Sequence, residues 1–71
     1  MKLRFTDHAQ YRVRERGISI EDIKLVIKQP DAIGLAFGNK MVAKKKLARY
    51  EIEVVYVEEK SDFVIITVYT I

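Results

Sequence analysis

A histidine and two arginines, spaced four residues apart, are the residues of this sequence best suited to do chemistry. His8, Arg12 and Arg16 stand in the stretch HAQYRVRERGI, and His8 is the chain's single histidine. A helix has about 3.6 residues per turn, so this spacing would place the three side chains along one stripe. Two cations on one stripe repel each other, which predicts an anion between them: a carboxylate of the chain or the phosphate of a ligand.

Such a stripe suits the chemistry of a phosphodiester. Arginine presents a fork of N–H donors to phosphate oxygens, and histidine exchanges protons near neutral pH. Cleavage of RNA without a metal needs a base for the 2′-hydroxyl, an acid for the leaving oxygen and cations for the phosphorane. We therefore predict catalytic roles for His8 and Arg12, and phosphate binding by Arg16. Tyr69 is a further catalytic candidate, for base stacking or proton donation.

A basic run follows in the middle of the chain, with three consecutive lysines and then Arg49. In a strand, Lys44 and Lys46 would share one face while Lys45 points to the other. The prediction is that Lys44, Lys46 and Arg49 bind nucleic acid along its phosphate backbone. The alternative is that the lysines only keep a strand edge from pairing with other sheets.

A purely structural interpretation of the helical stripe stands beside the catalytic one. Either arginine could pair with Glu15, Glu51 or Glu53 and anchor the helix to a sheet, and a histidine at a helix start could bond a backbone carbonyl. Our hypothesis divides the roles: Arg16 pairs with a carboxylate of the chain, while Arg12 stays available to phosphate. Because His8 has no second histidine or cysteine to join it, we expect no metal, and we expect no cofactor.

Length and composition predict one domain over residues 1–71, without disulfides because the chain has no cysteine. We expect it in the cytoplasm, since no signal peptide or membrane-spanning stretch stands out. Scarce asparagine and glutamine favour a thermophilic source. Residues 1–49 carry twelve Lys or Arg against five Asp or Glu, whereas residues 50–71 carry one against five. This asymmetry is typical either of a chain with an anionic partner or of one whose two halves neutralise each other.

Two helices are predicted before Pro30. The first starts at a cap on Thr6 or Asp7 and runs to about Arg16, with Gly17 at the left-handed C-terminal position. The second starts after Ser19 and runs from about residue 20 to 28. Its expected apolar face consists of Ile20, Ile23, Val26 and Ile27, with Leu25 pointing elsewhere.

Strands are predicted around and after these helices. Residues 2–5 could form a short edge strand, and residues 32–37, 40–47, 50–58 and 63–71 have strand patterns, with a turn at Gly38-Asn39 and another at 59–62. The fold class is therefore α+β: two N-terminal helices packed on one face of a three- to four-stranded antiparallel meander. Residues 63–71 are apolar on both faces, so we expect a central strand or a subunit contact, and a homodimer.

The helical motif resembles a family of small bacterial domains, the domain of unknown function numbered four-two-five-eight. The resemblance rests on His8, Ala9, Arg12, Arg16, Gly17, Ile18, Pro30 and Thr67 and spans nearly the whole chain. The size and element order are also similar to RelE-type and BrnT-type toxins, small ribonucleases that an antitoxin neutralises, which implies a RelE-like fold. The resulting hypothesis is a metal-independent endoribonuclease or RNA-binding domain of a toxin–antitoxin system, with RNA and an antitoxin as partners. The alternative is a non-catalytic binding domain whose His-Arg-Arg stripe is structural.

Overall fold

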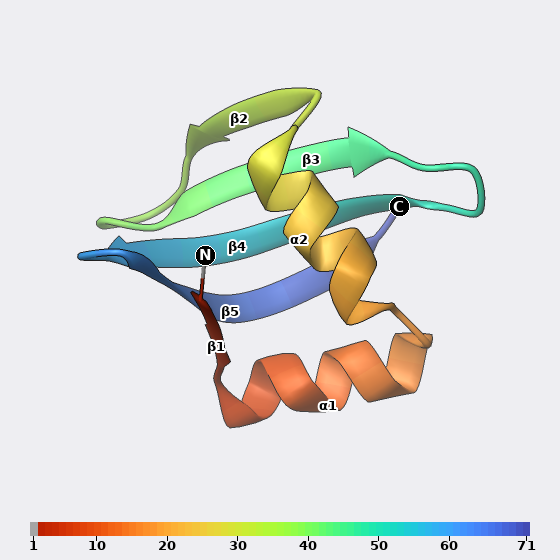
Figure 1. Cartoon of the computed structure of the whole chain (residues 1–71), viewed down its shortest axis with the longest axis horizontal. Helices are drawn as coiled ribbons and strands as arrows, with labels where there is room; N and C mark the ends of the chain where they lie inside the picture. Colours follow the sequence, from red (N-terminus) through yellow and green to blue (C-terminus); the bar gives the residue numbers. More distant parts are fainter. Residues whose placement is uncertain (1) are drawn as a thin grey trace.

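The computed structural model describes residues 2–71, which form a five-stranded sheet and two helices (Figure 1). Helix α1 (Asp7–Arg16) begins at Thr6, whose hydroxyl accepts a hydrogen bond from the Ala9 N–H, and ends at Gly17, where φ is 63°. A residue with a Cβ is strained at that angle, which explains the glycine. The predicted bounds and cap of this helix are confirmed.

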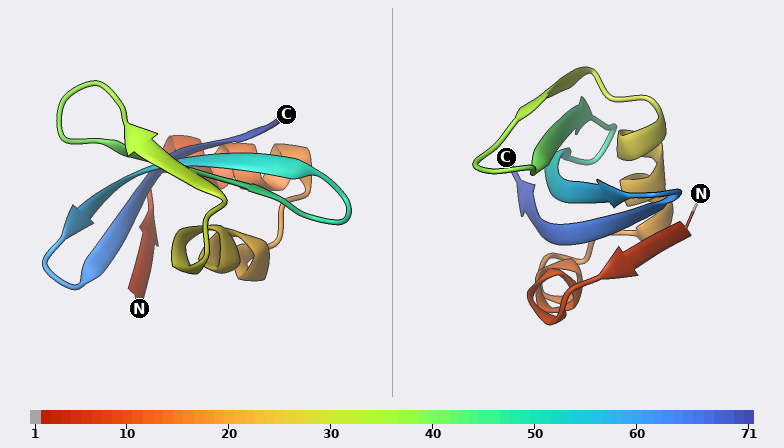
Figure 2. Two further views of the ribbon diagram at one scale, coloured as in Figure 1. Left: turned by 90° about the horizontal axis from the view of Figure 1, so that it is seen from above. Right: turned by 90° about the vertical axis from the view of Figure 1, so that its left-hand side faces the viewer.

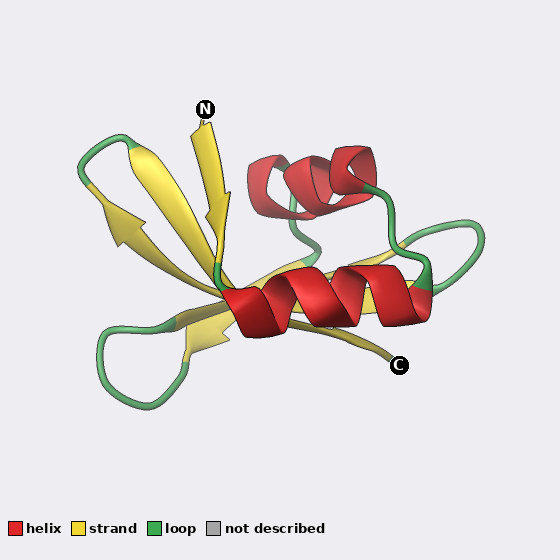
Figure 3. Cartoon of the chain, turned by 90° about the horizontal axis from the view of Figure 1, so that it is seen from below, coloured by secondary structure: helices red, strands yellow, loops and turns green. Residues whose placement is uncertain are grey.

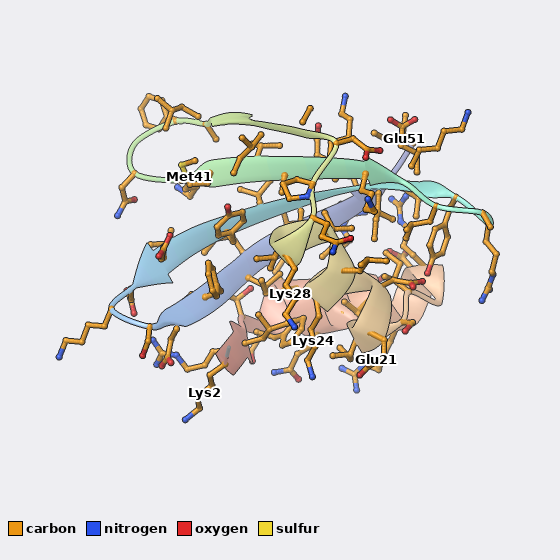
Figure 4. The ribbon with its side chains drawn as sticks, turned by 45° about the horizontal axis from the view of Figure 1, so that its top comes forward. Lys2, Glu21, Lys24, Lys28, Met41 and Glu51 are labelled. Atoms are coloured by element: carbon orange, nitrogen blue, oxygen red, sulfur yellow. The ribbon has the colours of Figure 1, made fainter. Side chains whose placement is uncertain are left out.

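Helix α2 (Ile20–Lys28) begins at Ser19, whose hydroxyl accepts hydrogen bonds from the N–H groups of Glu21 and Asp22. Ile23, Val26 and Ile27 are buried as predicted. Ile20 is 41% exposed, so its expected place in the buried face is wrong: it stands in the first turn and lines an open hollow beside Phe5 and Val13. Glu21, Lys24 and Lys28 occupy the outer side of this helix (Figure 4). No helix within residues 2–71 is long and apolar enough to cross a membrane.

The sheet has the strand order β1-β5-β4-β3-β2. Its strands are β1 (Lys2–Phe5), β2 (Ala32–Leu35), β3 (Met41–Lys46), β4 (Glu51–Glu59) and β5 (Asp62–Thr70). From β2 to β5 each strand runs antiparallel to the next, as the predicted meander requires. The predicted strand over 32–37 is shorter than expected, because the chain turns at residues 36–40, where Gly38 has a φ of 74°.

The predicted all-antiparallel sheet of three or four strands is wrong in the number of strands and in the orientation of one of them. Strand β1 pairs with β5 in parallel, with Phe5 beside Ile65, which makes a mixed sheet of five strands. A parallel pair needs a long crossover, and here nearly the whole chain lies between the two partners. The alternation of residues within 2–5 indicates a strand but carries no information about its distant partner.

The two helices lie against the sheet (Figures 2 and 3), and one hydrophobic core lies between them and the strands. Ala9 of α1, three residues of α2 and the inward side chains of β3, β4 and β5 are buried there; from β4 these are Ile52, Val54 and Tyr56. Strand β5 lies inside the sheet between β1 and β4, which confirms the prediction of a central strand.

We call the opposite side of the sheet the open face. Its side chains follow from the strand register: Val42, Lys44 and Lys46 of β3; Glu51, Glu53, Val55 and Val57 of β4; Val64, Thr67 and Tyr69 of β5. Tyr69, Glu53 and Lys44 are direct cross-strand neighbours and form one row over three strands. This face therefore has an apolar centre beside a charged row.

Candidate phosphate-binding site

Helix α1 is fixed to the edge of β5 where strand β1 ends. The Thr6 N–H donates to the Ile65 carbonyl at 3.1 Å, and the Thr6 hydroxyl donates to the Ile66 carbonyl at 3.0 Å. Strand β5 carries a bulge here, because Val55 and Tyr56 pair with Thr67 and Ile65 and leave Ile66 without an opposite residue. Bulges redirect the side chains that follow them. The bulge thus sets the position of Thr67 and Tyr69 relative to α1.

Arg12 and Tyr69 lie together at this junction. The guanidinium carbon of Arg12 is 5.8 Å from the centroid of the Tyr69 ring, within the range of a cation–π contact. Arg12 is half-buried, and its Nε is buried with no hydrogen-bond partner in residues 2–71. Its nearest carboxylate oxygen is Oε1 of Glu15, 3.8 Å from Nη1. The structure therefore brings together two of the three predicted catalytic residues.

Thr67 adds a second buried polar atom without a partner. Its residue is 7% exposed, and Oγ1 makes no hydrogen bond within residues 2–71. Thr67 and Tyr69 project from the same face of β5, two residues apart. Buried groups without partners are uncommon in folded proteins and call for a ligand, a water or a functional reason.

Arg16 turns to a different partner from Arg12. Its Nη1 donates to Oγ1 of Thr70 at 2.9 Å, and its Nε is 4.0 Å from Glu15. Arg16 does anchor α1 to the sheet, but through a hydroxyl: of the three carboxylates predicted as partners, only Glu15 of α1 itself lies within reach, and neither Glu51 nor Glu53 contacts Arg16. Those two glutamates lie opposite Lys46 and Lys44 in the strand register, which directs them over the open face and away from α1.

His8 is exposed on α1, one helical turn before Arg12, so both side chains border the same side of the helix. His8 and Arg12 therefore lie on an open surface of the molecule and not in a pocket. An apolar hollow of about 380 Å³ exists nearby, but its lining of Phe5, Gln10, Val13, Arg14 and Ile20 includes none of the predicted catalytic residues.

The basic run divides between the two faces of the sheet as predicted. Lys45 lies on the helix side, where its Nζ donates to the Gln29 carbonyl at 2.8 Å and is 3.4 Å from Asp31. Lys44 and Lys46 lie on the open face, each directly opposite a glutamate. Since each lysine has a carboxylate as its cross-strand neighbour, this run is a weaker phosphate track than its sequence indicates.

The family described as Domain of unknown function (DUF4258) matches this chain over residues 5–70. The chain belongs to this family. No curated protein and no solved structure matches it. The DUF4258 match includes His8, Arg12, Thr67 and Tyr69, so every side chain at the α1–β5 junction belongs to the family's domain. The similarity to RelE-type and BrnT-type toxins stays a prediction.

The predicted nucleic-acid residue Arg49 lies elsewhere in this DUF4258 domain. Its guanidinium carbon is 5.5 Å from the Tyr50 ring centroid, in the loop between β3 and β4. The Tyr50 hydroxyl donates to Oδ2 of Asp22 at 2.6 Å, and burial together with this bond raises the pKa of Tyr50. Tyr50 thus holds the start of α2 on the sheet, and Arg49 covers it.

The sequence gives Thr70 no predicted role at this site. It names Thr67 only as one of the residues that carry the family resemblance. One available signal is that both carry a hydroxyl within the largely apolar stretch 63–71. Within residues 2–71, no group of three or more His, Cys, Asp or Glu side chains could hold a metal ion.

Proposed function

We propose that this DUF4258 domain binds an RNA strand at the junction of α1 and β5 and cleaves it without a metal ion. The observation that carries the proposal is the position of Arg12: its guanidinium carbon lies 5.8 Å from the centroid of the partly exposed Tyr69 ring. Its one carboxylate neighbour within residues 2–71, Glu15, is 3.8 Å from Nη1 and so compensates its charge only weakly. A phosphate oxygen is the kind of acceptor that such a cation binds.

Each residue at the junction has a role in this proposal. Arg12 holds the phosphate and stabilises the charge that develops on it, while the Tyr69 ring, 40% exposed, offers a surface on which a base can stack. His8 takes the proton from the 2′-hydroxyl, whose oxygen then attacks phosphorus. The 5′-oxygen leaves with a proton from the Tyr69 hydroxyl, so the products are a 2′,3′-cyclic phosphate and a 5′-hydroxyl end.

The form of the surface favours a single strand over a duplex. Unpaired RNA can direct its bases onto an aromatic ring and its phosphates onto a neighbouring cation, whereas the bases of a duplex are already stacked. Along the row that begins at Tyr69, Lys44 lies two strands away and supplies a second cation, with Glu53 between them. Contact with the backbone is therefore limited to a few phosphates, and we propose a modest affinity with a weak salt dependence.

The proposal extends to a toxin that a cognate antitoxin neutralises in the cytoplasm, and this part is supported only by chain size and element order. The second candidate is a non-catalytic binding domain. The bond between Arg16 and Thr70 favours it, because this bond uses one arginine of the stripe to hold α1 on the sheet.

The test is a cleavage assay in EDTA on a single-stranded RNA labelled at its 5′ end. The wild-type protein should produce fragments with cyclic phosphate ends, and His8→Ala should reduce the rate by about 100-fold or more. Gln10→Ala, another exposed position of α1, is the matched control and should leave the rate unchanged. Equal rates for His8→Ala and wild type would point to a contaminating nuclease and reject the catalytic role.

A further inference from the structure

Strand β2 is one of the two edge strands of the sheet, and its outer edge has no partner within residues 2–71 (Figure 1). The hairpin to β3 is closed by a hydrogen bond from the Ala36 N–H to the Lys40 carbonyl at 2.8 Å. In an antiparallel pair, successive residues direct their backbone groups to opposite sides. The backbone groups of Gly34 therefore face β3, and those of Ile33 and Leu35 face outward.

This free edge is apolar and uncharged. Residues 32–39 contain no charged side chain, although the chain as a whole has 13 Lys or Arg and 10 Asp or Glu. Ile33 is 56% exposed, Leu35 81% and Phe37 91%. An exposed, unpaired and apolar edge is a template for another strand, and proteins usually block such an edge with charge, proline or a bulge.

The other edge of the same sheet is blocked in the usual way. Strand β1 carries Lys2 and Arg4, and Lys2 extends from that edge away from the sheet (Figure 4). Arg4 also forms an ion pair with Glu59 at 2.7 Å. One edge of this sheet is therefore charged and the other is not. Edge strands that face only solvent usually carry charge, as β1 does, and β2 lacks it.

We propose that β2 pairs with β2 of a second copy of this chain, antiparallel and about a two-fold axis that passes beside Gly34. In this register Ile33 lies opposite Leu35 of the second copy, and the two residues exchange both outward backbone hydrogen bonds. The two-fold axis repeats the exchange, so the pairing satisfies the outward N–H and C=O of both residues in both copies. The two sheets become one.

The side chains are compatible with this register. Ile33 and Leu35 lie on the helix side of β2, since their partners on β3 are Ala43 and Met41, so each would meet an apolar partner of the second copy. Gly34 lies opposite itself on the other side, where the absence of side chains lets the strands approach. Ala32 lies opposite Ala36 of the second copy. No pair in the register brings two charges together.

Charge is the reason to assign a second copy rather than a foreign strand. Each chain carries a net charge of +3, so two copies repel over much of their surface, and an uncharged edge lets them meet without bringing further like charges together. Residues 32–39 form such a surface. A strand pairing with its own copy about a two-fold axis also needs no complementary sequence from another protein.

Cysteine cross-linking tests the register directly, because the described chain has no cysteine of its own. A Cβ added at Gly34 meets nothing within 4 Å, so Gly34→Cys should fold normally. Opposite residues of this non-hydrogen-bonded type have Cα atoms about 4.5 Å apart, within the range of a disulfide. Gly34→Cys should convert almost fully to a covalent dimer under mild oxidation. Ser61→Cys, in the exposed turn between β4 and β5, is the control and should stay mainly monomeric.

Sedimentation of the unmodified chain at tens of micromolar provides the second measurement. The wild-type chain should show a species of twice 8.3 kDa, which Leu35→Lys should abolish while circular dichroism stays unchanged. Ile71→Lys, at an exposed apolar residue on another strand end, should leave the dimer intact. A monomeric wild type, equal cross-linking of the two cysteine variants, or a dimer that survives Leu35→Lys would overturn the proposal. A monomer would leave this edge to a strand of a different protein.

Discussion

Arg12 and Tyr69 come from opposite ends of the chain, yet the guanidinium carbon of Arg12 lies 5.8 Å from the centre of the Tyr69 ring. The contact depends on three features: the Thr6 cap that starts α1 at β5, the bulge at Ile66, and the helical spacing from Thr6 to Arg12. Its expected strength is about 0.5–1 kcal/mol for a partly exposed pair.

The first prediction concerns the ring of Tyr69. Tyr69→Phe keeps the aromatic face and should change RNA affinity by less than about twofold, whereas Tyr69→Leu removes the face and should weaken binding by roughly three- to tenfold. If Tyr69 is also the acid, Tyr69→Phe should lower the cleavage rate much more than the affinity. Fluorescence anisotropy and single-turnover cleavage separate the two effects; equal affinities for the Phe and Leu variants would contradict stacking.

The second prediction concerns the anchor between Arg16 and Thr70. Because Arg16 donates to a neutral hydroxyl at a half-exposed position, Arg16→Ala should lower the free energy of unfolding by about 0.5–1.5 kcal/mol. Urea unfolding of Arg16→Ala, Thr70→Ala and the double variant forms a double-mutant cycle. The combined loss should be smaller than the sum of the single losses. Strict additivity would mean that the bond does not contribute to stability.

Local features of this fold follow from the sequence, and its distant pairings do not. The helix ends are marked by local chemistry: the capping hydroxyls of Thr6 and Ser19 at the starts, and Gly17 and Pro30 at the ends. The alternation in β4 identifies its buried face. The parallel pairing of β1 with β5 depends on a contact across most of the chain. No periodicity within a four-residue strand contains that information.

In the candidate site, too, the local spacing could be predicted from the sequence and the distant contacts could not. Helical spacing places His8, Arg12 and Arg16 on one side of α1, as predicted. The choice of partners depends on the bulge in β5, which shifts the register of Thr67 and Tyr69 relative to the helix. A one-residue shift alters which side chains the helix meets, so the Arg16–Thr70 bond could not be predicted from residue types.

The third prediction concerns the buried hydroxyl of Thr67. Oγ1 has no partner within residues 2–71, so Thr67→Val, which replaces it by a methyl group of similar size, should raise the free energy of unfolding by about 1 kcal/mol. The measurement is urea unfolding, with Thr70→Val as the control that removes a bonded hydroxyl. A loss of stability for Thr67→Val would show that the hydroxyl is satisfied in solution.

The fourth prediction concerns alkaline pH. Burial, and then the bond to Asp22, raise the pKa of the Tyr50 hydroxyl above its ordinary value near 10. As the pH rises past about 10, the unfolded chain releases this proton first, so stability falls until the folded pKa is reached. Tyr50→Phe should reduce this fall without abolishing it, because burial also raises the pKa of Tyr56. Unfolding free energies of both proteins between about pH 8 and 11 provide the comparison, and equal slopes would contradict it.

The central claim is that Arg12 binds RNA phosphate, and the most direct test is the salt dependence of binding in Arg12→Ala. Anisotropy titrations of a single-stranded RNA should show weaker binding and a salt slope smaller by about 0.7, the value for one phosphate contact on a single strand. Arg14→Ala removes the same charge from an exposed position of the same helix and should leave affinity and slope nearly unchanged. Equal losses in Arg12→Ala and Arg14→Ala, or none in either, would contradict the account.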